Sequence, residues 1–213
     1  TPRILDVGCG PGVQTVDLLK MTGGNVLALD FLPLMIERTQ ANAESAGVAN
    51  RLEVVEQDMN QMAFPPASFD VIWSEGAIYN IGFETGLRKV KQFVTPGGYV
   101  AVSEVVWLTP QRPAPLVEFW SEYPEIDTVE NKLAVIDRLG YESEGHFVLP
   151  ECDWTDDYYD PMECLIAQKK KEWVGIPAAL AVIEEARREI DIFRKYSSYF
   201  GYTFFVMRRP KTL

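Results

Sequence analysis

The chain has 213 residues, 47% of them hydrophobic, with 31 Asp and Glu against 20 Lys and Arg and a formal net charge of −11. This apolar content excludes disorder, and no apolar run reaches the roughly 18 residues of a membrane span. The acidic balance argues against a broad nucleic-acid-binding face, and three cysteines with one histidine cannot assemble a plausible zinc site. We therefore expect a small-molecule partner, no nucleic-acid, membrane or metal partner, and a reducing cytoplasm as the location.

Short apolar runs alternate with helical patterns in the first half of the chain, which predicts βα units around a parallel sheet. Strands are expected at residues 3–7, 25–30, 52–57, 69–74 and 99–106. Helices are expected at residues 13–21, 33–46 and 83–94, the last of which would end at Pro96-Gly97-Gly98.

The pattern changes beyond Trp107. A proline-rich loop at residues 110–115 precedes an expected helix at 128–139 and an expected strand at 141–149. Residues 150–198 contain an acidic, aromatic opening and two helical stretches, and a last strand is expected at 199–208. The second half therefore adds strands and a helical insertion to the predicted sheet.

Alternate glycines occupy the turn between the first strand and the first helix, at Gly8, Gly10 and Gly12. Glycine tolerates positive φ and lets a ligand lie against bare backbone, and a helix start offers N–H groups that favour a carboxylate or phosphate. Asp30 ends the second strand, where an acidic residue in such folds accepts hydrogen bonds from ribose hydroxyls. These features predict a site for a nucleotide-like ligand, and a dehydrogenase would share them.

Further motifs complete a series along residues 3–106: Asp-x-Gly-x-Gly-x-Gly at 6–12, Asp30, Gln57-Asp58-Met59, Phe69-Asp70-Val71-Ile72 and Pro96-Gly97-Gly98. Together they resemble the class I S-adenosylmethionine-dependent methyltransferases, and within that family the small-molecule branch related to the quinone-biosynthesis C-methyltransferases. The resemblance implies an α/β fold with a doubly wound, mostly parallel, seven-stranded Rossmann-like sheet. Its last strand would be antiparallel, with a helical insertion before it.

The resemblance implies S-adenosyl-L-methionine as cofactor and S-adenosyl-L-homocysteine as product. The glycine turn would contact the methionine portion, Asp30 the ribose, Phe31 and Met59 the faces of the adenine, and Asp58 its amino group. The implied cofactor-binding set is Asp6, Gly8, Cys9, Gly10, Asp30, Phe31, Asp58, Met59, Ser74 and Glu75. Cys9 is expected as a small packed residue and not as a nucleophile.

The resemblance also implies how the chain is organised. We expect one methyltransferase domain over residues 1–213, with a cofactor-binding half at 1–106 and completion of the sheet by 107–149 and 199–213. Residues 150–198 would form a helical insertion or lid that sets the choice of acceptor. Family members usually carry a helical stretch before the first strand, so either an N-terminal segment is missing from this chain or the site is more open than usual.

Candidate acceptor contacts follow the fourth and fifth strands, where open parallel sheets place their ligand crevice. Nucleic-acid amino methyltransferases carry an Asn/Asp-Pro-Pro-aromatic run after the fourth strand, whereas this chain has Ser74-Glu75-Gly76-Ala77, which disfavours DNA or RNA methylation. Glu75 could orient substrate, take its proton or contact the cofactor, or it could be a solvated carboxylate at a helix start. Glu104 could face the pocket, or it could pair with Arg112. The candidate catalytic residues are Glu75, Tyr79, Glu104 and Tyr158.

Aromatic residues gather after the fifth strand and after residue 150: Trp107, Phe119, Trp120, Tyr123, Trp154, Tyr158 and Tyr159. They could form the rim of an apolar acceptor pocket, or they could be an ordinary core that joins the insertion to the sheet. Asp70 is expected to have a structural role, and the lone His146 a structural or surface role.

Methyl transfer from a sulfonium is an in-line displacement in which the protein mainly positions the acceptor and excludes water, so a strong base is optional. We therefore expect an enzyme, a methyltransferase that acts on a small molecule, and the exposed insertion could support a homodimer. Two alternatives stay open. An NAD-dependent oxidoreductase should lack the Asp58 series and the paired last strands, and a non-catalytic cofactor-binding module would contact a protein through residues 150–198.

Overall fold

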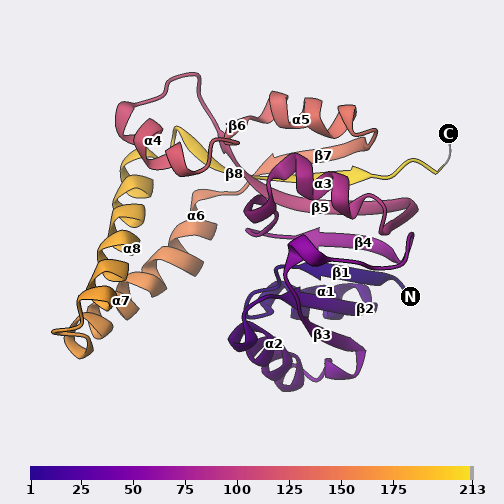
Figure 1. The fold of residues 1–213 in the computed structure, drawn as a ribbon, viewed down its shortest axis with the longest axis horizontal. Helices are drawn as coiled ribbons and strands as arrows, with labels where there is room; N and C mark the ends of the chain where they lie inside the picture. The colour runs from indigo at the N-terminus through magenta and orange to yellow at the C-terminus, as the bar shows by residue number, and fades with distance from the viewer. Residues whose placement is uncertain (212–213) are drawn as a thin grey trace. The chain divides into compact units, whose positions relative to one another are not determined.

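The structure is a computed structural model that describes residues 1–211, with the side chain of Asp157 left out, and it contains two compact units (Figure 1). Unit 1 comprises Thr1–Glu104, Asp127–Phe147 and Thr203–Leu213. Unit 2 comprises Val105–Ile126 and Val148–Tyr202. Each unit has its own hydrophobic core, so each is a packed body in its own right.

A single sheet organises unit 1. Its strands are β1 (Arg3–Val7), β2 (Asn25–Asp30), β3 (Leu52–Glu56), β4 (Phe69–Ser74), β5 (Val94–Trp107), β6 (Asp127–Thr128), β7 (Glu142–Val148) and β8 (Phe200–Arg208). The order is β3-β2-β1-β4-β5-β8-β7, and β6 pairs with β5. The last residues of β5 and the first residues of β8 belong to unit 2.

The central strands are parallel, with β1 paired to both β2 and β4 and with β2 paired to β3 and β4 to β5. The run β5-β8-β7 is antiparallel, and Arg209 N donates to the carbonyl of Gly98 at its edge. The predicted doubly wound sheet with an antiparallel last strand is therefore confirmed. One strand of the described sheet was not expected from the sequence. This is β6, whose two residues are too few to show a periodic pattern. The chain adds β2 and β3 on one side of β1 and then returns to add β4 and β5 on the other side. A crevice is expected at this point of reversal, at the carboxyl ends of β1 and β4.

The helices of unit 1 begin and end at the residues that favour helix boundaries. They are α1 (Val13–Thr22), α2 (Pro33–Ser45), α3 (Phe83–Val90) and α5 (Val129–Arg138), with the 3₁₀ turns η1 (Ala49–Arg51), η2 (Met59–Gln61) and η3 (Ile78–Ile81). Helix α1 lies between Gly12 and Gly23, both with left-handed φ. Helix α2 carries Pro33 at its start, and Thr128 accepts a cap hydrogen bond at the start of α5.

The Pro96-Gly97-Gly98 segment lies inside β5, so the predicted helix at 83–94 is too long and the predicted strand at 99–106 starts too late. The register shifts here, because Phe69 pairs with Val94 whereas Val71 pairs with Tyr99. Gly97 has a φ of 81°, and a Cβ on Gly98 would lie 2.7 Å from the Asp70 carbonyl oxygen. The glycines therefore form a bulge against β4 and not a helix stop.

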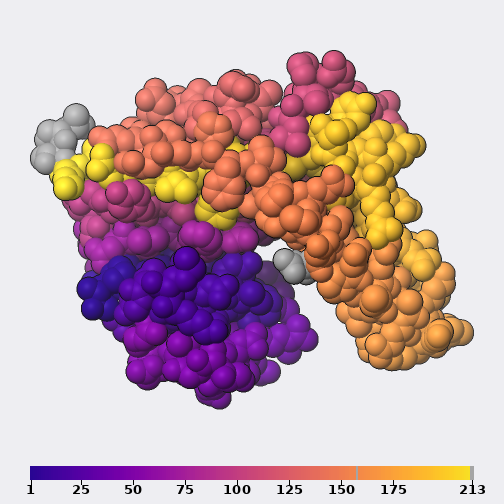
Figure 2. Space-filling model, turned by 180° about the vertical axis from the view of Figure 1, so that it is seen from behind, coloured from indigo at the N-terminus to yellow at the C-terminus, as the bar shows by residue number. Residues whose placement is uncertain are grey.

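Unit 2 is helical. Its elements are α4 (Ala114–Phe119), the 3₁₀ turn η4 (Trp120–Glu122), α6 (Glu151–Trp154), the π-helical η5 (Thr155–Tyr159), α7 (Asp160–Glu172) and α8 (Pro177–Tyr196). Helices α7 and α8 pack against each other, as their orange and yellow segments show in Figure 2. Residues 107–126, which were expected to help complete the sheet, belong to this unit, and α4 was not predicted. Within residues 1–211, none of the helices has the length and hydrophobicity of a membrane span.

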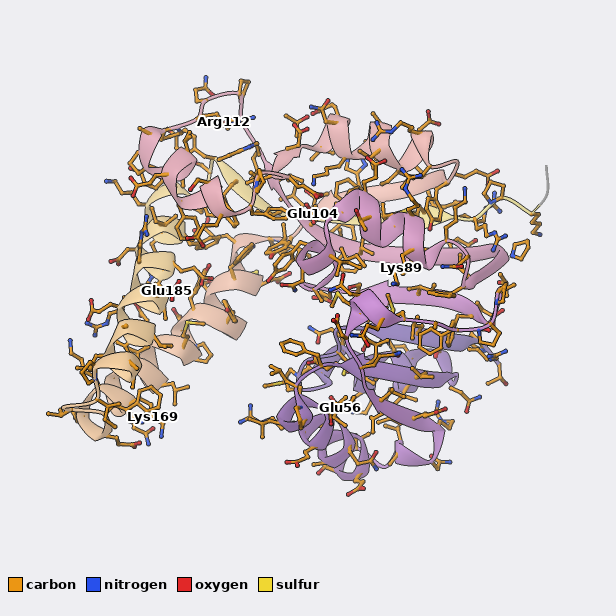
Figure 3. All side chains as sticks on the ribbon, viewed as in Figure 1. Glu56, Lys89, Glu104, Arg112, Lys169 and Glu185 are labelled. Carbon is orange, nitrogen blue, oxygen red and sulfur yellow. The ribbon has the colours of Figure 1, made fainter. Side chains whose placement is uncertain are left out.

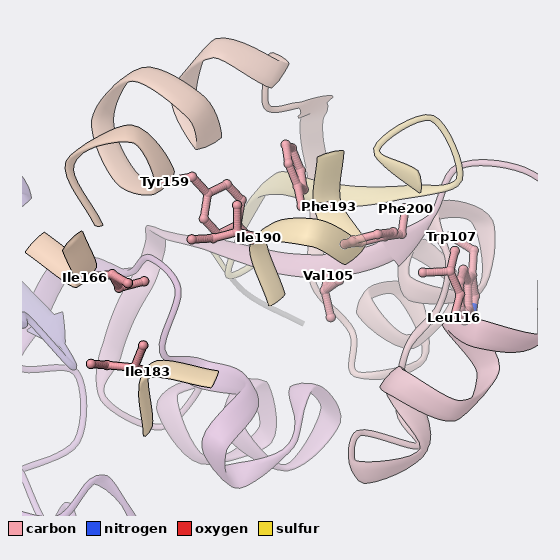
Figure 4. Close-up of a cluster of buried hydrophobic side chains, with 9 residues drawn as sticks. All are labelled: Val105, Trp107, Leu116, Tyr159, Ile166, Ile183, Ile190, Phe193 and Phe200. Carbon is pink, nitrogen blue, oxygen red and sulfur yellow. The ribbon is translucent and has the colours of Figure 1, made fainter. Parts of the chain in front are cut away.

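Most of the predicted rim aromatics form the core of unit 2. Figure 4 shows the nine buried members of this cluster, Val105, Trp107, Leu116, Tyr159, Ile166, Ile183, Ile190, Phe193 and Phe200. Trp120, Tyr123 and Trp154 pack against them, and the ring of Trp154 stacks on those of Tyr159 and Phe193 at 5.8 and 4.8 Å. For these residues the structure supports the packing interpretation over an acceptor pocket.

Candidate functional site

A cavity of about 600 Å³ opens in unit 1 at the carboxyl ends of its first parallel strands. Four segments contribute most of the lining: residues 8–11 of the glycine turn, 29–32 at the end of β2, 57–60 after β3 and 75–77 after β4. Each segment leaves the sheet at the same edge because the strands run in parallel. The cavity therefore lies where the sheet topology places a ligand site.

The glycine turn forms one wall of the cavity. Its first amides, those of Gly8 and Cys9, donate to the carbonyl oxygen of Leu29 at 2.9 and 3.0 Å. Gly8 is required by a close approach, because a Cβ there would lie 2.4 Å from the Cβ of Ala77. Gly10 has a φ of 53° and open space where a Cβ would project, so it exposes bare backbone to a ligand.

The Asp30 carboxylate is held by two backbone amides. Its Oδ2 accepts from Gly10 N and its Oδ1 from Leu32 N, both at 3.0 Å. A carboxylate has about four acceptor positions, so two remain for a ligand's hydroxyl groups. The two amides fix the direction in which those positions point.

The segment after β3 supplies a second carboxylate and an apolar side chain. Asp58 caps η2, because its Oδ1 accepts from the backbone N of Asn60 at 2.7 Å and from its Nδ2 at 3.1 Å. Met59 lines the cavity beside Asp58. The Phe31 ring also lines the cavity and is 64% exposed, so it offers an apolar face to a planar ligand.

Asp6 and Ser74, both in the predicted cofactor set, lie beneath the lining. Asp6 is 2% exposed and accepts a 2.5 Å hydrogen bond from the Thr15 hydroxyl. Burial, followed by the negative charges of Glu75 and Asp30, raises the pKa of this carboxyl to about 7 against the opposing effect of the Thr15 hydrogen bond. The Ser74 hydroxyl donates to the Val7 carbonyl at 2.8 Å and so ties β4 to β1.

The loop after β4 places Glu75 in the cavity lining. The next amide, that of Gly76, donates to the hydroxyl of Ser103 on β5 at 2.7 Å, which holds the loop against the sheet. Tyr79 belongs to η3 but is not part of the lining, whereas its neighbours Asn80 and Ile81 are.

Glu104 is not among the residues that line the cavity and forms a buried ion pair. Its Oε1 is 2.6 Å from Lys132 Nζ, and the two side chains are 0% and 4% exposed. The sequence left open a pairing of Glu104 with Arg112, but Arg112 belongs to unit 2 and donates there to the carbonyls of Thr109 and Gln111. Glu104 is labelled in Figure 3. Arg112 is near in sequence, but helix α5 brings Lys132 to the buried face of β5.

The described lining of the cavity does not include Tyr158, Asp70 or His146, which make other contacts. Tyr158 belongs to unit 2, where its ring lies 5.1 Å from that of Tyr159. Asp70 accepts from the Arg3 amide at 2.8 Å, at the amino end of β4, and His146 stacks on Phe205. Burial raises the pKa of the Cys9 thiol to about 12, so this cysteine is not an activated nucleophile.

Sequence reasoning missed four polar residues of the lining: Gln14, Gln57, Asn60 and Asn80. Gln57 and Asn60 flank the Asp58-Met59 pair, so their position after β3 was the available signal. Asn80 lies five residues after Glu75, in a 3₁₀ turn that the sequence did not predict. Among the described residues, no group of three or more His, Cys, Asp or Glu could hold a metal ion.

Comparison with known proteins gives a family match for a segment of unit 1. Residues 4–98 match the methyltransferase domain family, and the described residues that line the cavity fall within this range. The chain is 28% identical to a sterol 24-C-methyltransferase of Gibberella zeae over 76% of its length and 45% of the relative's. It is 24% identical to the 27-O-demethylrifamycin SV methyltransferase of Amycolatopsis mediterranei over 98% of its length and 77% of the relative's.

A solved structure shares the fold. It is a S-adenosylmethionine-dependent methyltransferase from Geobacter sulfurreducens in complex with S-adenosyl-L-homocysteine, with a TM-score of 0.84 and 20% identity over 97% of this chain and 84% of the other. The family match thus covers the segment that contains the cavity, and the solved structure shows that the chain has the same fold. The chain spans less than half the length of the sterol methyltransferases it matches.

Proposed function

We propose that the cavity of unit 1 binds S-adenosyl-L-methionine and that the protein transfers its methyl group to a small-molecule acceptor. The observation that carries this proposal is the Asp30 carboxylate, which two amides hold beside the exposed backbone of Gly10. When bound, the cofactor supplies a methyl group that its sulfonium already activates.

The donor and acceptor groups of the cavity fit this cofactor. Its ribose hydroxyls, adenine amino group and ammonium are all hydrogen-bond donors, and the described lining offers the carboxylates of Asp30, Asp58 and Glu75 as acceptors. The described lining contains no Lys or Arg side chain. This negative field favours a cationic sulfonium over the pyrophosphate of a dinucleotide, which argues against the oxidoreductase alternative.

The residues of the chain would act by binding and orientation. Asp30 would hold the ribose, Asp58 the adenine amino group, and Phe31 and Met59 the faces of the adenine. Fixing the cofactor in this way lets an acceptor react from one geometry, which can contribute about 7–11 kcal/mol to catalysis. No strong base is required, so Glu75 and Tyr79 are proposed as acceptor contacts, and Glu104 is not, because it is bound to Lys132.

The acceptor is proposed to be a small molecule, as the names of the sterol and rifamycin methyltransferases support. The likeness to the quinone-biosynthesis branch stays a proposal, so an acceptor panel should contain hydroquinones as well as sterols. The lid role of residues 150–198, an acceptor contact by Tyr158 and a homodimer stay predictions. We also propose a reducing, cytoplasmic location, for which the free thiols of Cys9, Cys152 and Cys164 are suited.

Replacing Asp30 with alanine should weaken S-adenosyl-L-methionine binding at least about tenfold, since a charged hydrogen-bonding group is worth roughly 1.5–3 kcal/mol. Isothermal titration calorimetry on the full chain measures this. Asp17→Ala, an exposed carboxylate on α1, is the matched control and should bind as the wild type does.

Each rival function has its own outcome in the same assays. Wild-type protein that binds NAD(H) and not S-adenosyl-L-methionine would support the oxidoreductase. Cofactor binding without methyl transfer to any member of the acceptor panel would support the non-catalytic module. Unchanged affinity of the Asp30 variant would reject the role of this residue.

A further inference from the structure

We propose that Thr39 of α2 is a positioning residue that sets the glycine turn for cofactor binding, an inference that rests on the proposed function. Thr39 is fully buried at 0% exposure. Its Oγ1 donates to the carbonyl oxygen of Gly10 at 2.9 Å and lies 3.6 Å from the Cys9 sulfur. Its Cγ2 would lie 2.6 Å from a Cβ on Gly12, so the side chain is packed against the turn as well as bonded to it.

Gly10 needs such a partner because packing does not fix it. No heavy atom lies within 4 Å of the point where its Cβ would be, and its φ of 53° is one of many that glycine can adopt. Side-chain hydrogen bonds hold it instead: its N–H donates to Asp30, and its C=O accepts from the Thr39 hydroxyl at 2.9 Å and from the Cys9 thiol at 3.7 Å. The thiol is the weaker donor, so the direction of both peptide groups at the cavity wall depends mainly on Asp30 and Thr39.

The same helix links this wall to the rest of the cavity. Helix α2 begins at Pro33, directly after the lining residues Asp30, Phe31 and Leu32. One turn beyond Thr39, the exposed Asn42 donates from Nδ2 to the Pro11 carbonyl at 2.8 Å. Thr39 and Asn42 thus tie the segment proposed to hold the methionine portion to the segment proposed to hold the ribose. Binding to a site that is already ordered costs less conformational entropy. The Thr39 and Asn42 hydrogen bonds should therefore raise the affinity for the cofactor.

A purely structural role makes a different prediction. A buried hydroxyl needs a hydrogen-bond acceptor, and the Gly10 carbonyl would meet that need whatever the turn does. In that case a substitution at Thr39 would lower stability and would change cofactor affinity only as far as it unfolds the protein. The pair of variants described next separates the two roles.

Thr39→Val keeps the shape and removes the hydroxyl, whereas Thr39→Ser keeps the hydroxyl and removes the methyl group. We expect Thr39→Val to weaken S-adenosyl-L-methionine binding five- to tenfold in calorimetry, with KM for the cofactor raised and kcat within twofold. Thr39→Ser should stay within twofold of the wild type in affinity. Amide hydrogen exchange at Gly10 should quicken in the valine variant and not in the serine variant.

Second variants on the surface of α2 guard against misfolding at the buried position. Asn42→Ala should weaken binding two- to threefold, and Ser45→Ala, which removes an exposed hydroxyl from the same helix, should leave it unchanged. Wild-type affinity in the valine variant, or equal losses in the valine and serine variants, would overturn the inference and leave the proposed function intact. Absence of binding by the wild-type protein would instead overturn the proposed function.

Discussion

Replacing Lys132 with methionine should lower the free energy of unfolding by about 3–5 kcal/mol, the usual cost of removing one partner of a buried ion pair. The Nζ atom lies 2.6 Å from Oε1 of Glu104 and 4.6 Å from the centre of the Phe83 ring. Without the ammonium, the Glu104 carboxylate would have to remain ionised in the core or take up a proton. Urea unfolding of the wild type and the variant at pH 7 measures the difference.

The double variant Glu104→Leu/Lys132→Met separates the ion pair from the volume that it fills. Because desolvation offsets much of a buried pair's attraction, removing both charges together should cost far less than removing one. Lys170→Met, an exposed lysine on α7, should leave the unfolding midpoint unchanged. If the double variant is as unstable as Lys132→Met, packing and not charge explains the loss.

Local signals in the sequence were sufficient for the parallel half of the fold and for much of the cavity. The strand expected at 69–74 is observed without a shift, because apolar runs between turn residues mark strands directly. Gly10, Asp30 and Asp58 line one cavity because each follows or ends a parallel strand, and parallel strands end at one edge. The position of these residues at the ends of predicted parallel strands was therefore enough to predict that they lie close together.

Contacts that depend on tertiary packing could not be predicted from the sequence. Lys132 was not identified as the partner of Glu104, because only the docking of α5 on the sheet brings the two together. The aromatic residues around Trp154 are of types that occur both at the rim of a ligand pocket and in a hydrophobic core. Only their packing in the fold shows that they belong to a core. The hydrogen bond from the Thr39 hydroxyl to the Gly10 carbonyl could not be predicted either, because it joins residues that are 29 positions apart in the sequence.

Replacing Asp6 with asparagine should make stability less dependent on pH between about 4 and 7. The pKa of this carboxyl is raised by burial from 3.8 to about 7 in the folded protein. In that window the folded state holds a proton that the unfolded state has lost, so the free energy of unfolding falls as pH rises and the loss is complete above pH 7. A shift of about three units corresponds to roughly 4 kcal/mol.

The asparagine variant keeps an oxygen that can accept the Thr15 hydroxyl, and it has no proton to lose. It should therefore match the wild type near pH 4 and exceed its stability by a few kcal/mol at pH 8, as measured by urea unfolding at a series of pH values. Groups that do not interact with Asp6 titrate equally in both proteins, so the difference between the two curves reports Asp6 together with its coupling to Glu75 and Asp30. Thr15→Val should move the wild-type midpoint to higher pH, because the lost hydrogen bond is the contact that lowers this pKa. Parallel curves for the wild type and Asp6→Asn would mean that the carboxyl is ionised in the folded protein across the whole range.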